Sequence, residues 1–314
     1  MAANEINDVQ PTSLSHIACD SNKLIIEQCR VALDAAFADN RRLDHTLMLG
    51  PPGTGKSTLA SVLAAEMAVP FIECVGDNLK TAADVNNLLL QAEDKAIVHI
   101  DEIHAAPRNV MELLYIALDK RQLFVRGKTS IMPIPLNDFT LIASTTEEAD
   151  LPAPWISRMR LILRYDFYTV EDLGLLLERR AHGLEWGVDA TSLPLIARAA
   201  RGTPRIAFRL LMAARRVCRA EGDTLITTAH VQRALVLDGL DDLGLGEFER
   251  KYLRLLLSGP RRINVLASAM GVPARNLSTT TEPYLIRAGL VDKDDQSRRV
   301  LLPKGRQHLS QFSC

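Results

Sequence analysis

Residues 50–57 read GPPGTGKS and match the pattern G-x-x-x-x-G-K-[ST] at every fixed position. An apolar run at residues 47–49 precedes them and a helical pattern over residues 58–67 follows. The glycines therefore lie at a strand-to-helix turn, where backbone N–H groups and the helix N-terminus can surround a phosphate. In such a loop Lys56 reaches the outer phosphates and the hydroxyl of Ser57 is a ligand for Mg²⁺. The alternative is an ordinary Gly/Pro turn, but both flanks favour a phosphate-binding loop.

Length and composition suggest a cytoplasmic protein of more than one domain. A chain of 314 residues is long enough for two or three domains. It contains no apolar run of 18 residues, and its start has no basic region followed by an apolar block, so we expect neither a membrane span nor a signal peptide. The five cysteines show no C-x-x-C spacing, which favours reduced thiols over a metal cluster.

Charge is unevenly distributed along the chain. From Arg250 to Cys314 there are 12 Lys/Arg and 4 Asp/Glu, whereas the part before Arg250 carries 25 and 34. This basic end is typical of a module that binds a polyanion, attached to an acidic body with another task. A solvated charged surface is the alternative.

The first half of the chain alternates strand and helix patterns. The predicted strands are residues 47–49, 70–75, 96–100 and 140–146, and the predicted helices are residues 23–39, 58–67, 81–92 and 110–120. This alternation indicates an α/β fold with a doubly wound parallel sheet, whose ligands bind at the carboxyl ends of the strands. Residues 123–135 contain Gly127 and two prolines and suggest an irregular hairpin.

The second half reads as helices. Helical patterns cover residues 170–184, 193–200, 205–220 and 229–237, with no strand expected among them, and residues 238–246 look like a linker. Beyond it, residues 264–270 and 274–288 form a helix-turn-helix pattern, and short strands near residues 290–291 and 300–302 make it a winged helix. We therefore predict three domains: a phosphate-binding α/β domain with the N-terminal segment at 1–168, a small all-α lid at 169–240 and a winged helix at 241–314.

Two carboxylates end the third predicted strand. Asp101 and Glu102 follow the apolar run about 45 residues after the phosphate loop, at the sheet edge where strand ends converge. Asp101 is expected to hold Mg²⁺, and Glu102 to orient or deprotonate the attacking water. Surface carboxylates also close many strands, so the phosphate loop is what gives this pair its meaning. His104 fits a capping role as well as a functional one.

Other polar residues lie where they can act on a nucleotide. Thr145 and Thr146 end the next strand and can bond the γ-phosphate or the water, although threonine is also simply common in strands. Arg158 can stabilise phosphoryl charge from across a subunit boundary, with surface solvation as the alternative. Arg205 follows Pro204 at a helix start and can link nucleotide state to domain rotation.

The basic end is suited to the backbone of duplex DNA. Its aromatic residues are few, so stacking on single-stranded bases is not the expected mode. Contact with phosphates fits the composition better. The candidate contacts are Arg261, Arg262, Arg275, Arg287, Lys293, Arg298, Arg299, Lys304 and Arg306.

Taken together, these motifs resemble the AAA+ ATPases, and within them the RuvB family of bacterial Holliday-junction branch-migration ATPases. The stretches that carry the resemblance are GPPGTGKSTLA, HIDEIH, LLYIAL, FTLIASTT, RGTPRIAFRLL and EPYLIRAGLV, in the family's order. RGTPRIA and EPYLI are the specific ones, since the phosphate loop alone indicates only an NTPase.

The resemblance implies a homohexameric ring that uses ATP and Mg²⁺ to move duplex DNA at four-way junctions, beside the partner RuvA and the resolvase RuvC. It implies that Thr146 is the sensor-1 residue, Arg158 the trans-acting arginine finger and Arg205 the sensor-2 arginine, which join Lys56, Asp101 and Glu102 in catalysis. The implied nucleotide contacts are Gly50, Pro51, Gly53, Thr54, Gly55, Lys56, Ser57, Thr58, Tyr168 and Arg205, with Tyr168 near the base. The implied metal ligands are Ser57 and Asp101, and the implied DNA contacts are Lys293, Arg298 and Arg299.

The chain departs from the family pattern in four places. Residues 10–12 and 18–20 replace the family's N-terminal motifs, and residues 155–159 (WISRM) keep one arginine of the family's two. The hairpin at residues 124–135, through which the family binds RuvA, looks shortened. The wing tip at residues 292–296 (DKDDQ) is acidic, so DNA contacts are expected to be weaker or differently placed.

The sequence thus favours an ATP-driven DNA motor over two alternatives. One is a divergent AAA+ remodeller or clamp-loader-like ATPase that leaves four-way junctions unmoved. The other is a nucleotide-switched DNA-binding regulator with negligible turnover.

Overall fold

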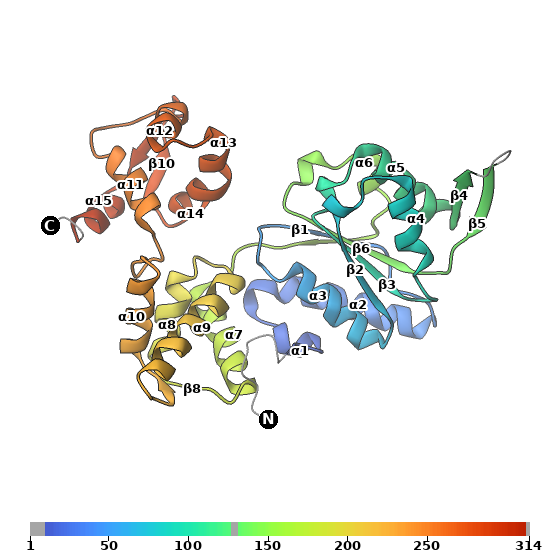
Figure 1. The fold of residues 1–314 in the computed structure, drawn as a ribbon, viewed down its shortest axis with the longest axis horizontal. Coiled ribbons are helices and arrows are strands. Elements are labelled where there is room, and N and C mark those ends of the chain that lie inside the picture. The colour runs from blue at the N-terminus through green and yellow to red at the C-terminus, as the bar shows by residue number, and fades with distance from the viewer. Residues whose placement is uncertain (1–9, 127–130, 312–314) are drawn as a thin grey trace. The chain divides into compact units, whose positions relative to one another are not determined.

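The computed structural model of the chain describes residues 10–126 and 131–311. It divides into two compact units (Figure 1). The first ends at Gly187 and also contains Gly202–Arg209, and the second contains Val188–Arg201 and the chain from Leu210 onward. Helix α9 (Pro204–Ala220) begins in the first unit and continues in the second. Each unit is described on its own below.

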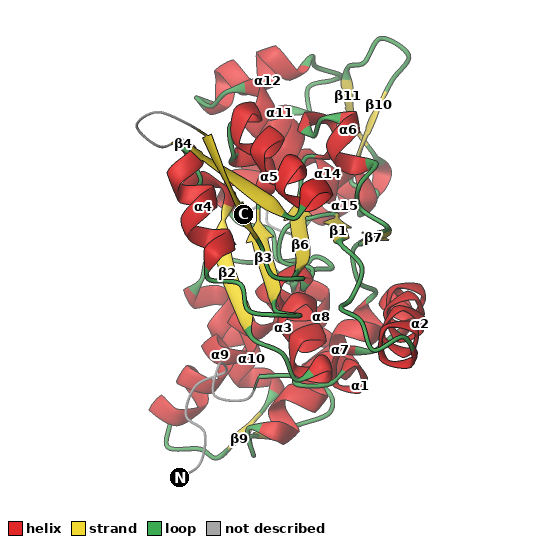
Figure 2. Cartoon of the chain, turned by 90° about the vertical axis from the view of Figure 1, so that its right-hand side faces the viewer, coloured by secondary structure: helices red, strands yellow, loops and turns green. Residues whose placement is uncertain are grey.

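The first unit is built on a five-stranded parallel sheet with the strand order β2-β3-β6-β1-β7. Figure 2 shows β2, β3 and β6 side by side. Its strands are β1 (Thr46–Leu49), β2 (Phe71–Val75), β3 (Ile97–Asp101), β6 (Thr140–Thr145) and β7 (Leu161–Arg164). Because all the strands are parallel, the carboxyl ends of β1, β3 and β6 lie at one edge. The predicted α/β class is confirmed.

Helices cover both faces of the sheet (Figure 1). Apolar side chains of α1, α2 and α3 pack on one face, and those of α4, α5 and α6 pack on the other. The bounds are α1 (Leu14–Ile17), α2 (Lys23–Ala38), α3 (Lys56–Met67), α4 (Ala82–Leu90), α5 (Arg108–Lys120), α6 (Ala153–Ile156) and α7 (Val170–Gly183). Four 3₁₀ turns accompany them: η1 (Asp20–Asn22), η2 (Gly76–Asn78), η3 (Ile103–Ala105) and η4 (Glu148–Asp150). The predicted helices of this half are present, with ends shifted by a few residues.

Strand β7 was not predicted. It pairs with β1, with Thr46 opposite Leu161 and Leu49 opposite Arg164. It is only four residues long and ends in Arg164, so its apolar run of three residues is too short to indicate a strand by itself.

The predicted hairpin is an antiparallel ribbon of β4 (Gln122–Arg126) and β5 (Ile131–Pro135). Phe124 and Met132 are large apolar side chains that it leaves exposed. The tip, including Gly127, lies outside the described residues.

The second unit contains lid helices and the winged helix. Its helices besides α9 are α8 (Ser192–Ala199), α10 (Thr228–Leu237), α11 (Glu247–Leu255), α12 (Ile263–Met270), α13 (Ala274–Asn276), α14 (Glu282–Arg287) and α15 (Pro303–Ser310), and a π-helical turn, η5 (Leu277–Thr281), joins α13 to α14. The wing is the antiparallel pair β10 (Val291–Lys293) and β11 (Arg299–Leu301). The winged helix is therefore as predicted, with α13, η5 and α14 in place of one regular helix.

Three short elements here were missed. The two-residue strands β8 (Gly187–Val188) and β9 (Leu225–Ile226) lie where only helices were expected. Helix α15 begins at Pro303, which is favourable in a first turn, but its sequence PKGRQHLS offers few apolar residues to show a helical period.

Two whole-chain features complete the description. Four described cysteines are free thiols, namely Cys19, Cys29, Cys74 and Cys218, and Cys314 lies outside the described residues. Within residues 10–126 and 131–311, no helix has the length and apolar character needed to cross a membrane.

Candidate functional site

The phosphate-binding loop joins β1 to α3. Lys56 is buried at the first position of α3, and its ammonium donates to the carbonyl oxygens of Gly50 and Pro51, each at 2.8 Å. Burial lowers the pKa of Lys56, while the carboxylates of Glu102 and Asp101 act in the opposite direction. The lysine is therefore held on the loop with two carboxylates near it.

Two glycines of the loop are required by its shape. Gly53 has a φ of +74°, and a Cβ there would lie 2.9 Å from Thr203 Cγ2 and 3.0 Å from Arg205 Cβ. Gly55 has a φ of +98° and caps the start of α3. Glycine adopts this region without the steric penalty of other residues. The loop can thus direct its N–H groups inward at the helix N-terminus.

The predicted catalytic side chains meet beside this loop. Ser57 Oγ lies 3.3 Å from Asp101 Oδ2. Glu102 has a φ of +48°, a left-handed conformation that costs on the order of 1–3 kcal/mol for a non-glycine residue. Its Oε2 accepts hydrogen bonds from the N–H and the hydroxyl of Thr146, both at 3.2 Å. The structure therefore brings together four residues from three separate segments of the chain.

His104 is half-buried next to this group. Its Nδ1 lies 2.9 Å from Thr145 Oγ1 and 3.2 Å from Glu102 Oε2. The histidine thus connects the ends of β3 and β6, in addition to the direct contact between Glu102 and Thr146.

A polar chain behind Asp101 was not predicted. Ser144 Oγ donates to Asp101 Oδ1 at 2.5 Å, His99 Nε2 lies 3.1 Å from Ser144 Oγ, and His99 Nδ1 lies 3.1 Å from Glu73 Oε1. His99 and Ser144 are fully buried, and burial lowers the pKa of His99. The available signal was a histidine and a serine within otherwise apolar strands, AIVHI and LIAST.

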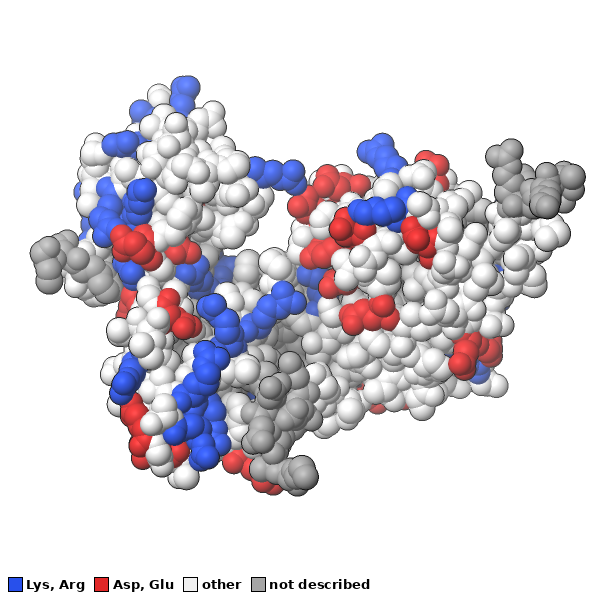
Figure 3. All heavy atoms as spheres, in the orientation of Figure 1, with Lys and Arg blue, Asp and Glu red and all other residues white. Residues whose placement is uncertain are grey.

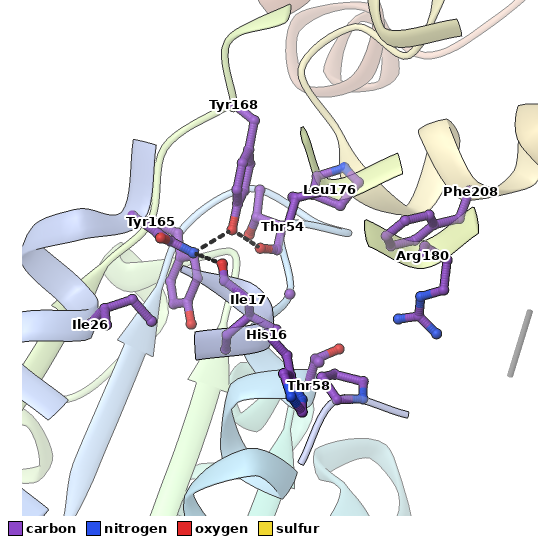
Figure 4. Close-up of a pocket in the computed structure, with 14 residues that line it drawn as sticks. His16, Ile17, Ile26, Thr54, Thr58, Tyr165, Tyr168, Leu176, Arg180 and Phe208 are labelled. Carbon is purple, nitrogen blue, oxygen red and sulfur yellow. Dashed lines mark hydrogen bonds between the residues drawn. The ribbon is translucent and has the colours of Figure 1, made fainter. Parts of the chain in front are cut away.

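A pocket opens next to the loop (Figure 4). Tyr168 donates its hydroxyl proton to the carbonyl oxygen of Thr54 at 3.1 Å and accepts from Asn22 Nδ2 at 3.3 Å. Burial raises the pKa of Tyr168, so its hydroxyl stays protonated. The pocket reaches the phosphate-binding loop through Thr54 and Gly55. Its lining also includes His16, Ile17, Thr58, Arg180, Pro204 and Phe208.

The N-terminal segment is attached to the first lid helix. Asp172, in the first turn of α7, accepts hydrogen bonds from the N–H groups of Asp20 and Ser21 at 3.1 and 2.8 Å. It also accepts from the Ser21 hydroxyl. Burial acts to raise the pKa of Asp172, but the hydrogen bonds from Ser21 and its neighbours outweigh burial and lower it. The first turn of α7 therefore holds the segment that precedes α2 through two backbone N–H groups and one hydroxyl.

Comparison with known families matches all three parts of the chain. Residues 9–165 match the Holliday junction DNA helicase RuvB P-loop domain, residues 168–241 the RuvB AAA lid domain, and residues 242–310 the RuvB C-terminal winged helix domain. The chain belongs to the RuvB family. It is an ATP hydrolase of the branch-migration type.

Individual RuvB proteins are similar along most of their length. The RuvB subunit of the Thermotoga maritima Holliday junction branch migration complex is 34% identical over 309 residues, which covers 96% of this chain and 92% of that protein. The Prochlorococcus marinus subunit is 38% identical over 288 residues, covering 89% and 82%. The structure of the Thermotoga maritima RuvB branch migration motor superposes with a TM-score of 0.81 at 34% identity and covers 96% of this chain and 98% of that chain.

The two arginines that the RuvB resemblance assigned to catalysis lie in different places. The backbone N–H of Arg205 donates to Gly53 O at 3.3 Å, and the positive charge of Arg205 contributes to lowering the pKa of Lys56. Arg158, which follows α6, instead packs against α5: its Nε and Nη2 bond Asp119 Oδ2 at 2.8 and 2.6 Å, and its guanidinium lies 4.4 Å from the centre of the Tyr115 ring. Arg205 is thus next to the loop of its own chain, whereas Arg158 is paired with α5.

The wing residues expected to contact DNA differ from one another. Lys293 is exposed, and Arg298 is half-buried with its Nε 2.7 Å from Asp294 Oδ2. Arg299 is buried, and its guanidinium forms two hydrogen bonds with Glu282, at 2.8 and 2.9 Å. Tyr252 donates to the same carboxylate at 2.7 Å. The expectation of a DNA contact at Arg299 does not fit this burial, since its donors face the domain core.

The residues of this RuvB-family site fit a nucleotide with Mg²⁺. A hydroxyl and a carboxylate, Ser57 and Asp101, are the oxygen ligands that Mg²⁺ prefers, and their facing oxygens are 3.3 Å apart. The space next to Gly53 would be filled by any Cβ. The bound ion would supply charge that stabilises the phosphates.

Proposed function

We propose that this chain couples ATP hydrolysis to branch migration of Holliday junctions. The observation that carries the proposal is the meeting of Ser57, Asp101, Glu102 and Thr146 at one end of the phosphate-binding loop. This set includes metal ligands, a group to activate water and a group to sense the γ-phosphate, as phosphoryl transfer requires. Family membership indicates which process the hydrolysis drives, because the relatives of this chain are subunits of Holliday junction branch migration complexes.

Within one chain, each side chain has a distinct task. Lys56 exchanges its two carbonyl partners for phosphate oxygens, and Ser57 and Asp101 hold Mg²⁺. Glu102 orients and deprotonates water, while Thr146 bonds the γ-phosphate. Arg205, at the start of α9, contacts the phosphates and thereby couples the nucleotide state to rotation of the lid.

The base and sugar occupy the pocket beside Tyr168. Thr54, Gly55 and Thr58 form its wall near the phosphates, and the Tyr168 hydroxyl anchors that wall through Thr54 O. Gly50, Pro51 and Gly53 complete the cradle. We expect adenine to be the base in this pocket, because ATP is the nucleotide that the RuvB family hydrolyses.

Hydrolysis is completed by a second copy of the chain. Arg158 is held away from the loop by Asp119 and Tyr115, on a surface that a neighbouring subunit can approach. A guanidinium supplied in trans would stabilise the charge of the transferred phosphoryl group. The assembly we propose is a homohexameric ring, as in the family, acting in the cytoplasm.

Duplex DNA is held by the winged helix through phosphates. Lys and Arg side chains are spread over this domain on the face drawn in Figure 3. Lys293 on the wing and exposed Arg262, Lys304 and Arg306 are the proposed contacts, with Arg298 once it leaves Asp294. Phosphate contact of this kind carries little base specificity and weakens strongly with salt.

The β4–β5 hairpin is the proposed surface for a RuvA partner. Phe124 and Met132 are 44% and 54% exposed there, so both side chains are accessible to a partner. RuvC is expected to join the same complex.

A synthetic four-way junction tests the proposal. With ATP, Mg²⁺ and a RuvA partner, the wild-type chain should convert the junction to duplex products, and Glu102→Gln should not. Glu93→Gln, which changes an exposed glutamate elsewhere in the unit, is the matched control and should behave as wild type. A chain that hydrolyses ATP but leaves junctions unmoved would instead be a remodeller. Negligible turnover with Glu102 intact would indicate a regulator.

A further inference from the structure

We infer that Ser144 and His99 are positioning residues that fix the rotation of the Asp101 carboxylate for metal binding. The inference rests on the proposed function, because it concerns the Mg²⁺ held by Ser57 and Asp101. The two residues act at Oδ1 of Asp101, whereas Ser57 faces Oδ2.

The two oxygens of Asp101 have different partners. Oδ1 accepts hydrogen bonds from the Ser144 hydroxyl at 2.5 Å and from the N–H of Glu102 at 3.1 Å. Oδ2 lies 3.3 Å from Ser57 Oγ. The protein thus occupies one oxygen and turns the other toward the metal position, so the carboxylate cannot rotate without losing two hydrogen bonds.

Hydrogen-bond polarity assigns His99 its part. An ionised carboxylate only accepts, so the Ser144 proton points at Asp101. The Ser144 oxygen is then free to accept from His99 Nε2, 3.1 Å away, which requires the tautomer with the proton on Nε2 and leaves Nδ1 of the neutral ring with no proton to donate to Glu73. His99 therefore keeps the Ser144 hydroxyl from turning away from Asp101.

Burial makes this arrangement rigid. The His99 side chain is fully buried, whereas its outer partner Glu73 is 51% exposed at the side chain and can bond water instead. Ser144 is also fully buried, between β3 and β1 in the sheet. We therefore expect His99 and Ser144 to matter and Glu73 to matter little.

The test separates metal binding from nucleotide binding. Mn²⁺, followed by electron paramagnetic resonance, is titrated into the full-length chain with ADP, and ADP affinity is measured separately in EDTA. Ser144→Ala should raise the Kd for Mn²⁺ about tenfold, as loss of an outer-shell partner does at metal sites. ADP affinity in EDTA should stay within twofold of wild type.

Companion variants keep the result decisive. His99→Phe keeps a ring but removes the donor and should weaken Mn²⁺ binding in the same sense. The double variant should be no worse than Ser144→Ala, because His99 acts through Ser144. Ser61→Ala, which removes a hydroxyl that bonds the Thr58 carbonyl, should leave both affinities unchanged.

Two results would overturn the inference. One is a Mn²⁺ Kd within twofold of wild type in Ser144→Ala. The other is an equal loss of ADP affinity in EDTA, which indicates general distortion. If Ser144→Ala does not fold, His99→Phe decides by the same criteria. Asp101→Asn tests the metal position separately from the positioning residues. If this variant binds Mn²⁺ as tightly as wild type, the proposed metal position itself is wrong.

Discussion

Lys56 occupies a site that tolerates no neutral side chain. It is buried beside two carboxylates and bonded to two carbonyl oxygens. Lys56→Ala removes the positive charge directed at the phosphates and should lower the ATP hydrolysis rate by about 10²–10³-fold, the usual effect of losing one charge-stabilising group. Lys80→Ala, on the surface next to Asp77, is the matched control. A steady-state phosphate-release assay measures both, and an active Lys56→Ala would refute the proposed role.

At the residue scale, the sequence shows which side chains take part in the chemistry more reliably than it shows which side chains are buried. Ser57, Asp101, Glu102 and Thr146 were predicted to meet because parallel strands end at one edge, and they do. Arg299 was misjudged because a basic residue in a wing reads as surface, and nothing local indicates that Glu282, 17 residues earlier, is its partner. His99 and Ser144 were overlooked since their contacts join different strands.

Asp172 connects two elements, and this connection should depend on pH. Its pKa in the folded chain lies below the usual 3.8. Above pH 3.8 the carboxylate is ionised in folded and unfolded states, so its stabilisation is fully present. As the pH falls below 3.8, toward and through the lower folded pKa, that stabilisation is lost.

Urea unfolding of wild type and Asp172→Asn between pH 7 and pH 2 checks this. The variant should be less stable at neutral pH, and the difference between the two free energies of unfolding should shrink as the pH falls below 3.8. A difference that stays constant with pH would show that the charge of Asp172 does not contribute.

The winged helix depends on a buried ion pair between its elements. Glu282 on α14 bonds Arg299 on β11 and Tyr252 on α11. Glu282→Ala leaves a buried unpaired guanidinium and should lower the local free energy of unfolding by about 3–5 kcal/mol. Hydrogen exchange of winged-helix amides in the full chain measures it. Glu282→Leu combined with Arg299→Met should recover much of the loss, and equal losses in both would argue against an uncompensated charge.

At the element scale, apolar periodicity predicted the long helices and the buried strands. It missed β7 because the strand offers only three successive apolar residues, and α15 because few of its side chains face the core. It also gave one helix over residues 274–288, where the structure has a π-helical turn at η5. Such a turn depends on packing around Leu277 and Thr281, which are buried.

The whole assembly offers a test that no single chain can provide. Arg158→Ala should lower the ATP hydrolysis rate by about 10³–10⁵-fold, because the site of the neighbouring subunit then lacks the arginine supplied in trans. Lys56→Ala should also lower the rate strongly, since the phosphates in its own site are not held. Mixed in equal amounts, the two variants form seams with one intact loop facing one intact arginine, and phosphate release should reappear. A mixture no more active than its components would rule out action in trans.

The ion pair between Arg299 and Glu282 also has a mechanical consequence. DNA held on the wing, as proposed above, would pull on β10 and β11 as the duplex moves. Because Arg299 fastens β11 to α14 and, through the shared carboxylate, to Tyr252 of α11, tension on the wing reaches the body of the domain without first stretching a flexible arm. A rigid attachment of this kind would lose little of each movement to elastic stretching of the wing.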